Sequence, residues 1–143
     1  MLKEKIYDFI KNETYAVVST TNRAGHPESA LVGFSQTESL EIVFATQDKT
    51  RKIENILHNP NVAIAIGPGD EKYTGIQIEG SARVVRVEDA GEYADAHYKK
   101  IPSARPRKED EGECFVIVTL SWARYTDVGS KPEEVIEDYL DAD

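Results

Sequence analysis

The chain has 143 residues, 40% hydrophobic and 30% charged, which is typical of a single globular domain, residues 1–143, that can bury a core. Its net charge of −9 disfavours binding to nucleic acid or to an anionic membrane surface. The one cysteine, Cys114, excludes an internal disulfide and opens an apolar run, which predicts a buried thiol. Neither a signal-peptide pattern nor a membrane-spanning run is present, so we expect a cytoplasmic protein.

The N-terminal half predicts a helix, a strand meander and a second helix. Apolar residues three and four positions apart indicate an amphipathic helix over residues 2–13. Three strands joined by short polar turns follow, over residues 15–21, 28–35 and 40–46. Because short turns join antiparallel neighbours, these strands form a meander. Thr50 is a candidate N-cap for a short helix over residues 50–58, which stops before Pro60.

The C-terminal half predicts further strands with helices between them. Its expected strands cover residues 62–67, 73–87 and 113–128, and its expected helices cover residues 90–100 and 132–140. Gly80 interrupts the alternation of the long middle strand, which indicates a bend or bulge. The whole pattern predicts a mostly β fold of the α+β kind, an antiparallel barrel with short peripheral helices.

Several familiar catalytic patterns are missing from the sequence. The three histidines, His26, His58 and His97, are far apart and have no paired cysteines, so we expect no metal site. There is no P-loop, no GxGxxG and no GxSxG motif. No side chain is marked as catalytic, and the catalytic residues are unknown at this stage.

One short segment concentrates positive charge in this acidic chain. Lys49, Arg51 and Lys52 surround the start of the helix at residues 50–58, beside the hydroxyls of Thr46 and Thr50. A helix N-terminus with hydroxyls and cations can hold a phosphate group. The alternative is a solvated first helical turn, but cations there oppose the helix dipole, and a bound anion would resolve that conflict.

This segment resembles the flavin mononucleotide (FMN)-binding split-barrel family, which includes the pyridoxamine 5′-phosphate oxidases. The resemblance rests on the order of Phe44-Ala45-Thr46, Thr50-Arg51-Lys52, Asn59-Pro60 and the strand Val62-Ala63-Ile64-Ala65-Ile66. The later run Ile78-Glu79-Gly80-Ser81-Ala82 is similar to the I-E-G-x-A strand of that family. No single piece is specific, but the ordered set covers roughly residues 6 to 88.

The resemblance implies an antiparallel split β-barrel of about six strands and a homodimer that binds FMN in clefts between the subunits. It implies a flavin-dependent oxidoreductase that acts on an unidentified small molecule or electron donor. Arg51 and Lys52 would hold the phosphate, with hydroxyls from Thr46 and Thr50. The remaining cofactor-binding residues that we carry over are Ala30, Leu31, Val32, Gly33, Ala45, Lys49, Gln77 and Trp122.

Departures from the family pattern leave alternatives open. Ala30 and Ser35 stand where the oxidases carry an Arg and a Lys on the flavin, which argues for a compact, generic member instead of a true pyridoxamine phosphate oxidase. Gln77 could equally be a surface residue, and Trp122 a core residue. Relatives of this fold take a deazaflavin or haem, and a cofactor-free interaction or stress-related module is a third reading. The loop at residues 101–112, with Arg105, Arg107 and Lys108, could cover the cleft or be simply a charged loop.

Overall fold

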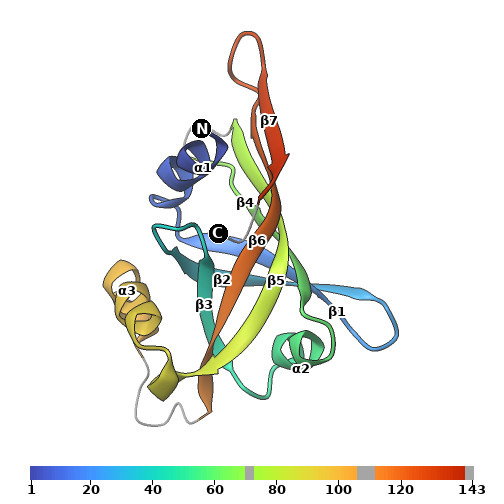
Figure 1. The fold of residues 1–143 in the computed structure, drawn as a ribbon, viewed down its shortest axis with the longest axis vertical. Helices are drawn as coiled ribbons and strands as arrows, with labels where there is room; N and C mark the ends of the chain where they lie inside the picture. The colour runs from blue at the N-terminus through green and yellow to red at the C-terminus, as the bar shows by residue number, and fades with distance from the viewer. Residues whose placement is uncertain (70–72, 106–111, 141–143) are drawn as a thin grey trace.

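A computed structural model describes residues 1–69, 73–105 and 112–140 (Figure 1). Its α-helices are α1 (Leu2–Ile10), α2 (Arg51–His58) and α3 (Glu92–Lys100), with short 3₁₀ turns η1 (Val87–Asp89) and η2 (Pro102–Ala104). Its strands are β1 (Tyr15–Thr21), β2 (Pro27–Gln36), β3 (Ile42–Gln47), β4 (Asn61–Ile66), β5 (Thr74–Arg86), β6 (Glu113–Asp127) and β7 (Glu134–Tyr139). The predicted elements up to residue 128 are confirmed, most with ends that differ by one or two residues.

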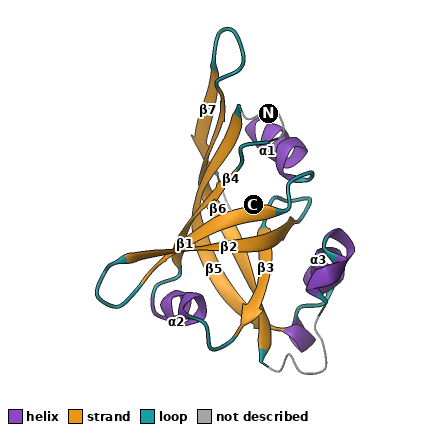
Figure 2. Cartoon of the chain, turned by 180° about the vertical axis from the view of Figure 1, so that it is seen from behind, coloured by secondary structure: helices purple, strands orange, loops and turns teal. Residues whose placement is uncertain are grey.

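Six antiparallel strands close into a barrel. The sheet runs in the order β3-β2-β1-β4-β5-β6-β7, and a further pairing of β3 with β6 closes the ring (Figure 2). Among the described strands, β7 pairs only with β6 and therefore lies outside the closed barrel. The β6–β7 hairpin projects from one end and the β1–β2 hairpin from one side (Figure 1). The expectation of a mostly β, antiparallel split barrel of about six strands is confirmed.

Strict alternation of side chains builds the barrel interior. Along β4, Val62, Ile64 and Ile66 are buried while the residues between them are exposed. β5 changes register against β6 between Glu79 and Gly80, which is the bulge that the sequence predicts. A Cβ atom on Gly80 would lie 2.5 Å from the Thr119 carbonyl oxygen, so the close approach of the two strands requires glycine there.

Helices cover different parts of the barrel. α1 buries Leu2, Ile6 and Ile10 in the main core, while α2 and α3 lie toward the other end of the molecule, on different sides (Figure 1). α3 packs on a second apolar cluster that includes Phe115. Cys114 is a buried free thiol, as predicted, and burial raises its pKa. None of the helices in the described part of the chain is long and apolar enough to cross a membrane.

The predicted helix over residues 132–140 is wrong. Residues Glu134–Tyr139 form β7, which pairs with the part of β6 that extends beyond the barrel, with Ile136 opposite Tyr125. Ile136 and Leu140 pack partly against the core. A spacing of four residues places two side chains on one face of a helix and also on one face of a strand. The exposed edge of β6 offers backbone hydrogen bonds, and these decide in favour of the strand.

Candidate functional site

A cavity of about 390 Å³ lies where α2 meets the barrel. β1 and β2 supply one wall, and the loop before α2 and its first turn supply the other. Its lining residues are Thr20, Glu28, Ser29, Ala30, Lys49, Thr50, Arg51 and Lys52. The volume is within the range of small-molecule sites. Five of the residues that the sequence predicts for cofactor binding therefore share one cavity: Ala30, Lys49, Thr50, Arg51 and Lys52.

The start of α2 leaves backbone donors free of side-chain caps. Thr50 has extended backbone angles and is the N-cap, as predicted, but its side chain makes no cap hydrogen bond. Its hydroxyl donates instead to the Gln47 carbonyl oxygen at 3.0 Å and accepts a hydrogen bond from Thr46 at 3.4 Å. The N–H groups of the first turn of a helix have no partner within the helix. In this cavity, these N–H groups can donate hydrogen bonds to an anion.

The three cations of the cavity differ in their contacts. Within the described residues, Lys49 and Lys52 form no side-chain hydrogen bond or ion pair, whereas Arg51 forms an ion pair with Glu28. The Arg51 side chain is 82% exposed and that of Glu28 is 22% exposed. Two lysines and an exposed arginine therefore face a common space, which favours binding of a negatively charged group.

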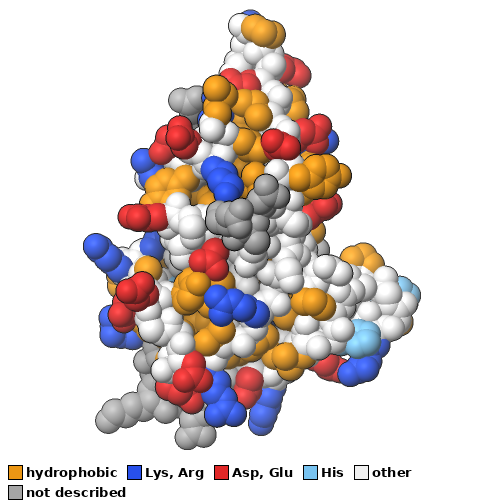
Figure 3. All heavy atoms as spheres, viewed as in Figure 1, with side chains coloured by type: hydrophobic (Ala, Val, Ile, Leu, Met, Phe, Trp, Pro, Cys, Tyr) orange, Lys and Arg blue, Asp and Glu red, His pale blue; other side chains and the backbone are white. Residues whose placement is uncertain are grey.

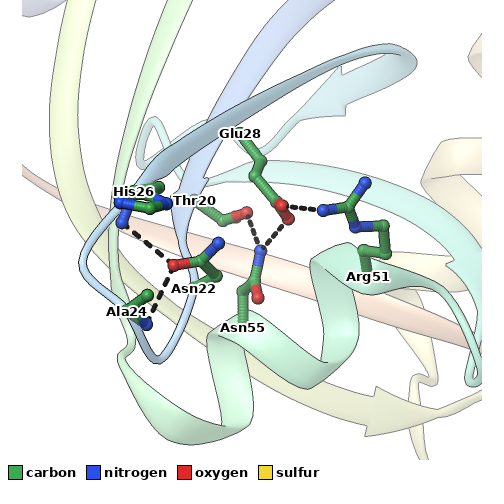
Figure 4. Close-up of polar contacts among 7 residues, drawn as sticks. All are labelled: Thr20, Asn22, Ala24, His26, Glu28, Arg51 and Asn55. Carbon is green, nitrogen blue, oxygen red and sulfur yellow. Dashed lines mark hydrogen bonds and ion pairs between the residues drawn. The ribbon is translucent and has the colours of Figure 1, made fainter.

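A polar network fixes Glu28 beside Arg51 (Figure 4). Asn55 on α2 is 5% exposed and donates from Nδ2 to Glu28 Oε1 at 2.8 Å and to Thr20 Oγ1 at 2.9 Å. The Asn55 hydrogen bond and the positive charge of Arg51 lower the pKa of the Glu28 carboxyl. The nearby turn is held by Asn22, which accepts hydrogen bonds from two backbone N–H groups (Figure 4). Glu28 is therefore a rigidly held carboxylate inside a positively charged cavity.

Two of the other predicted residues lie on the outer face of the sheet. Leu31 pairs with Val17, Val17 with Ala65, and Ala65 with Gln77, so Leu31 and Gln77 share one row across four strands. Leu31 is 68% exposed, and Gln77 is also exposed. Gln77 lines a separate hollow of about 430 Å³ beside the β4–β5 connection. Within one chain, these two residues do not join the cationic cavity.

The other predicted residues have different surroundings. Trp122 is half-buried on β6 opposite Glu79, one row from Gln77, and its ring lies 5.4 Å from the Arg124 guanidinium. The Val32 side chain is in the core, so only its backbone can face a ligand. Ala45 packs partly against the second apolar cluster. A Cβ atom on Gly33 would lie 3.3 Å from Ile101 Cδ1, so this stretch of β2 is closely covered.

Ser35 lies away from the cavity. Its hydroxyl is hydrogen-bonded to Nδ1 of the buried His97 at 2.8 Å and joins β2 to α3. A serine at this position therefore has a structural partner of its own. In the loop at residues 101–112, the exposed Arg105 lies 5.1 Å from the Tyr98 ring, while Arg107 and Lys108 lie outside the described residues.

The sequence reading missed Glu28, Asn55 and Thr20. A signal for Glu28 was available, because it lies two residues before Ala30 and a period of two places both on one face of β2. Asn55 carries a weaker signal, since it is a polar residue between Ile53 and Ile56 on the apolar side of α2. Charged side chains of both signs are interspersed with apolar ones on the face shown in Figure 3, so colour alone does not mark the site.

A comparison with models of protein families identifies the family of the chain. The model of the pyridoxamine 5′-phosphate oxidase family matches residues 2–127. The chain belongs to this family. A comparison with curated proteins finds no match for this family member.

Three solved structures with a similar fold are described in different terms. A heme binding protein from Mycobacterium smegmatis has a TM-score of 0.81 and 15% identity over 97% of this chain, which spans only 58% of that protein. The General Stress Protein 26 from Bacillus anthracis has a TM-score of 0.73 and 25% identity, with 96% and 98% of the two chains covered. A pyridoxamine 5′-phosphate oxidase-related, FMN binding protein from Nostoc punctiforme has a TM-score of 0.65 and 12% identity, with 90% and 87% covered.

Proposed function

We propose that this family member binds FMN as a cytoplasmic homodimer and acts as a flavin-dependent oxidoreductase on a small molecule. The observation that carries the proposal is the cavity at the start of α2, where Lys49, Arg51 and Lys52 converge on backbone donors without side-chain caps. These groups fit a phosphate, because charge-assisted hydrogen bonds from cations and helical N–H groups are its usual partners. The related Nostoc protein is described as FMN binding.

The outer face of the sheet supports the homodimer. Tyr15, Val17 and Leu31 are exposed apolar side chains on the neighbouring strands β1 and β2. Exposed apolar patches of this kind commonly mark interaction surfaces. A second copy seated there would cover these side chains and would bring Gln77 and Trp122 near a ring system that extends from the cavity. Size-exclusion chromatography with light scattering tests this, and Leu31→Glu should give monomers.

The residues of the chain bind and orient the cofactor, and flavin itself supplies the redox chemistry when bound. Lys52 and Arg51 would neutralise the phosphate, while Thr46 and Thr50 would add hydroxyl contacts. No side chain is assigned to proton transfer. The substrate is a small molecule that reaches the flavin between the subunits.

Titration of the purified protein with FMN, followed by flavin fluorescence, tests the proposal. We expect Lys52→Ala and Arg51→Ala each to weaken FMN binding by roughly tenfold or more, because each removes a charge-assisted contact worth about 1.5–3 kcal/mol. Lys99→Ala is the matched control, since Lys99 is an exposed lysine on α3. A colourless protein that binds no added FMN overturns the proposal.

The same titration, repeated with haem and with a deazaflavin in place of FMN, tests two other cofactors. Haem is a second candidate because the Mycobacterium smegmatis protein with the similar fold is described as heme binding. Haem binding would give the intense absorption band of haem, and a deazaflavin would bind without the flavin absorption. A protein that takes none of the three cofactors would favour an interaction or stress-related module, as the likeness to General Stress Protein 26 suggests.

A further inference from the structure

Among the described residues that line the cationic cavity, Glu28 is the one carboxylate. An acidic side chain is unexpected in a site that is built to attract an anion, because it repels the same ligand. It is not a loosely placed surface group, since Asn55 donates to Oε1 at 2.8 Å while Arg51 pairs with Oε2. The proposed FMN binding assigns Glu28 no role.

The two partners of this ion pair differ in their freedom to move. Glu28 is held from below by the buried Asn55, whereas the Arg51 side chain is 82% exposed and extends over the cavity. The guanidinium can therefore turn from the carboxylate to another anion without disturbing the core. Glu28 cannot follow it, because its other oxygen is bound to Asn55.

We propose that Glu28 competes with the incoming anion for Arg51 and thereby sets how tightly the cavity holds a phosphate group. The inference rests on the proposed function, because it concerns the same anion site. The described lining residues include three cations and one carboxylate, a net charge of +2. Within this part of the chain, the pairing of Arg51 with Glu28 leaves Lys49 and Lys52 as the two cations without an ion pair. A phosphate monoester carries close to two negative charges at neutral pH.

Binding then becomes an exchange of partners. The anion first meets Lys49 and Lys52 and then draws Arg51 away from Glu28, so part of the attraction to Arg51 is offset by the lost ion pair and by repulsion from the carboxylate. Glu28 thus lowers the affinity of the cavity for an anion. A residue that merely oriented Arg51 for the ligand would have the opposite effect on affinity when it was removed.

Glu28→Gln is the decisive variant. The glutamine oxygen can still accept the Asn55 hydrogen bond, so the network that fixes β2 to α2 is kept while the negative charge is removed. Glu54→Gln is the matched control, because Glu54 is an exposed carboxylate in the first turn of α2 and does not line the cavity. Glu28→Ala, which removes the carboxylate altogether, gives a second reading if the glutamine variant folds poorly.

We expect Glu28→Gln to lower the Kd for FMN by roughly three- to tenfold, and Glu54→Gln to change it by less than about twofold. A second probe is sulfate, a dianion that does not titrate near neutral pH. The rise in melting temperature that sulfate produces should be larger for Glu28→Gln than for the wild type or Glu54→Gln, because tighter binding to the folded state stabilises it more.

The two probes separate the failure of this inference from the failure of the proposed function. If FMN binds but Glu28→Gln leaves its affinity unchanged or weakens it, the competition is overturned and FMN binding stands. If no variant binds FMN but sulfate stabilises Glu28→Gln more than the controls, the competition stands and the FMN proposal fails. If neither the wild type nor Glu28→Gln responds to either anion, both are overturned.

Discussion

α2 and α3 both dock on the barrel through a buried polar residue, yet the two networks end differently. Asn55 of α2 connects through Glu28 to an exposed arginine and a cavity lined with lysines. His97 of α3 is 1% exposed, bonds Ser35 and stands edge-on to the Phe115 ring at 5.5 Å. A polar residue on the buried face of a helix therefore does not itself mark a binding site. What matters is whether its network reaches a space open to a ligand.

The pKa shifts in the two regions favour opposite charge states of the titratable groups. Burial, with the nearby Lys100 charge, lowers the pKa of His97 to about 4, which favours the neutral ring. Burial likewise lowers the pKa of Lys100 to about 8. Near α2, the Asn55 hydrogen bond and the Arg51 charge lower the pKa of Glu28, which favours its charged form. Burial in the α3 region therefore shifts His97 and Lys100 toward their neutral forms, whereas the contacts of Glu28 near α2 shift it toward its charged form.

The largest expected effect is a loss of stability, without a loss of FMN binding, when His97 of α3 is replaced. His97→Ala should lower the free energy of unfolding by roughly 3–4 kcal/mol, because it opens a cavity against Phe115 and leaves Ser35 without its partner. Its FMN affinity should stay within about twofold of the wild type, since His97 does not line the cationic cavity. Lys52→Ala should weaken FMN binding and leave the free energy of unfolding nearly unchanged. Urea unfolding and FMN titration measure both variants, and a matching loss of FMN binding in His97→Ala would contradict the separation.

A second prediction concerns the pH dependence of the α3 region. The pKa of His97 is lower in the folded chain than the ordinary 6.5, so the folded state binds fewer protons there than the unfolded state. This contribution to stability is complete above pH 6.5 and is lost as the pH falls toward 4. It amounts to about 3 kcal/mol at most.

The measurement compares the wild type with His97→Gln by urea unfolding between pH 7 and pH 4. Carboxylates titrate in both proteins, so the difference between their free energies of unfolding isolates His97. We expect the advantage of the wild type to shrink by about 2–3 kcal/mol over this range. A constant difference would show that His97 is not held neutral by its surroundings.

The smallest expected effects compare two tyrosines of α3. The Tyr93 hydroxyl donates to Glu41 at 3.0 Å and accepts from Arg83 at 3.1 Å, whereas the buried Tyr98 hydroxyl has no hydrogen-bond partner within the described residues. Tyr93→Phe should therefore cost about 1 kcal/mol of stability, and Tyr98→Phe should cost nothing or stabilise slightly. Thermal unfolding of both variants tests this, and a larger loss for Tyr98→Phe would reverse the assignment.

Strand periodicity made most of the barrel predictable from the sequence. Short polar turns fixed the β1–β2–β3 meander, and Gly80 marked the bulge in β5. β7 was not predictable, because the spacing of Ile136 and Leu140 suits either a helix or a strand and only the free edge of β6 decides between them. The ring closure of β3 on β6 is equally a long-range event that no local pattern encodes.

The cationic part of the site could be predicted because its residues are neighbours in the sequence. Lys49, Arg51 and Lys52 surround a helix start, and their convergence follows from local geometry. Glu28 and Thr20 reach the same cavity from other strands, so only the tertiary pairing of β1, β2 and α2 reveals them. The outer row of Leu31 and Gln77 likewise depends on the registers of four strands.

The closing pair of the barrel also bears on how the chain folds during synthesis. β3 forms its second ladder with β6, with Ile42 opposite Val118 and Gln47 opposite Glu113. Until residues 113–118 have left the ribosome, one edge of β3 has no partner and Phe44, fully buried in the finished barrel, lacks part of its cover. Such long-range pairings slow folding and leave strand edges open to other chains. The last third of the chain therefore determines when the first strands are protected from aggregation.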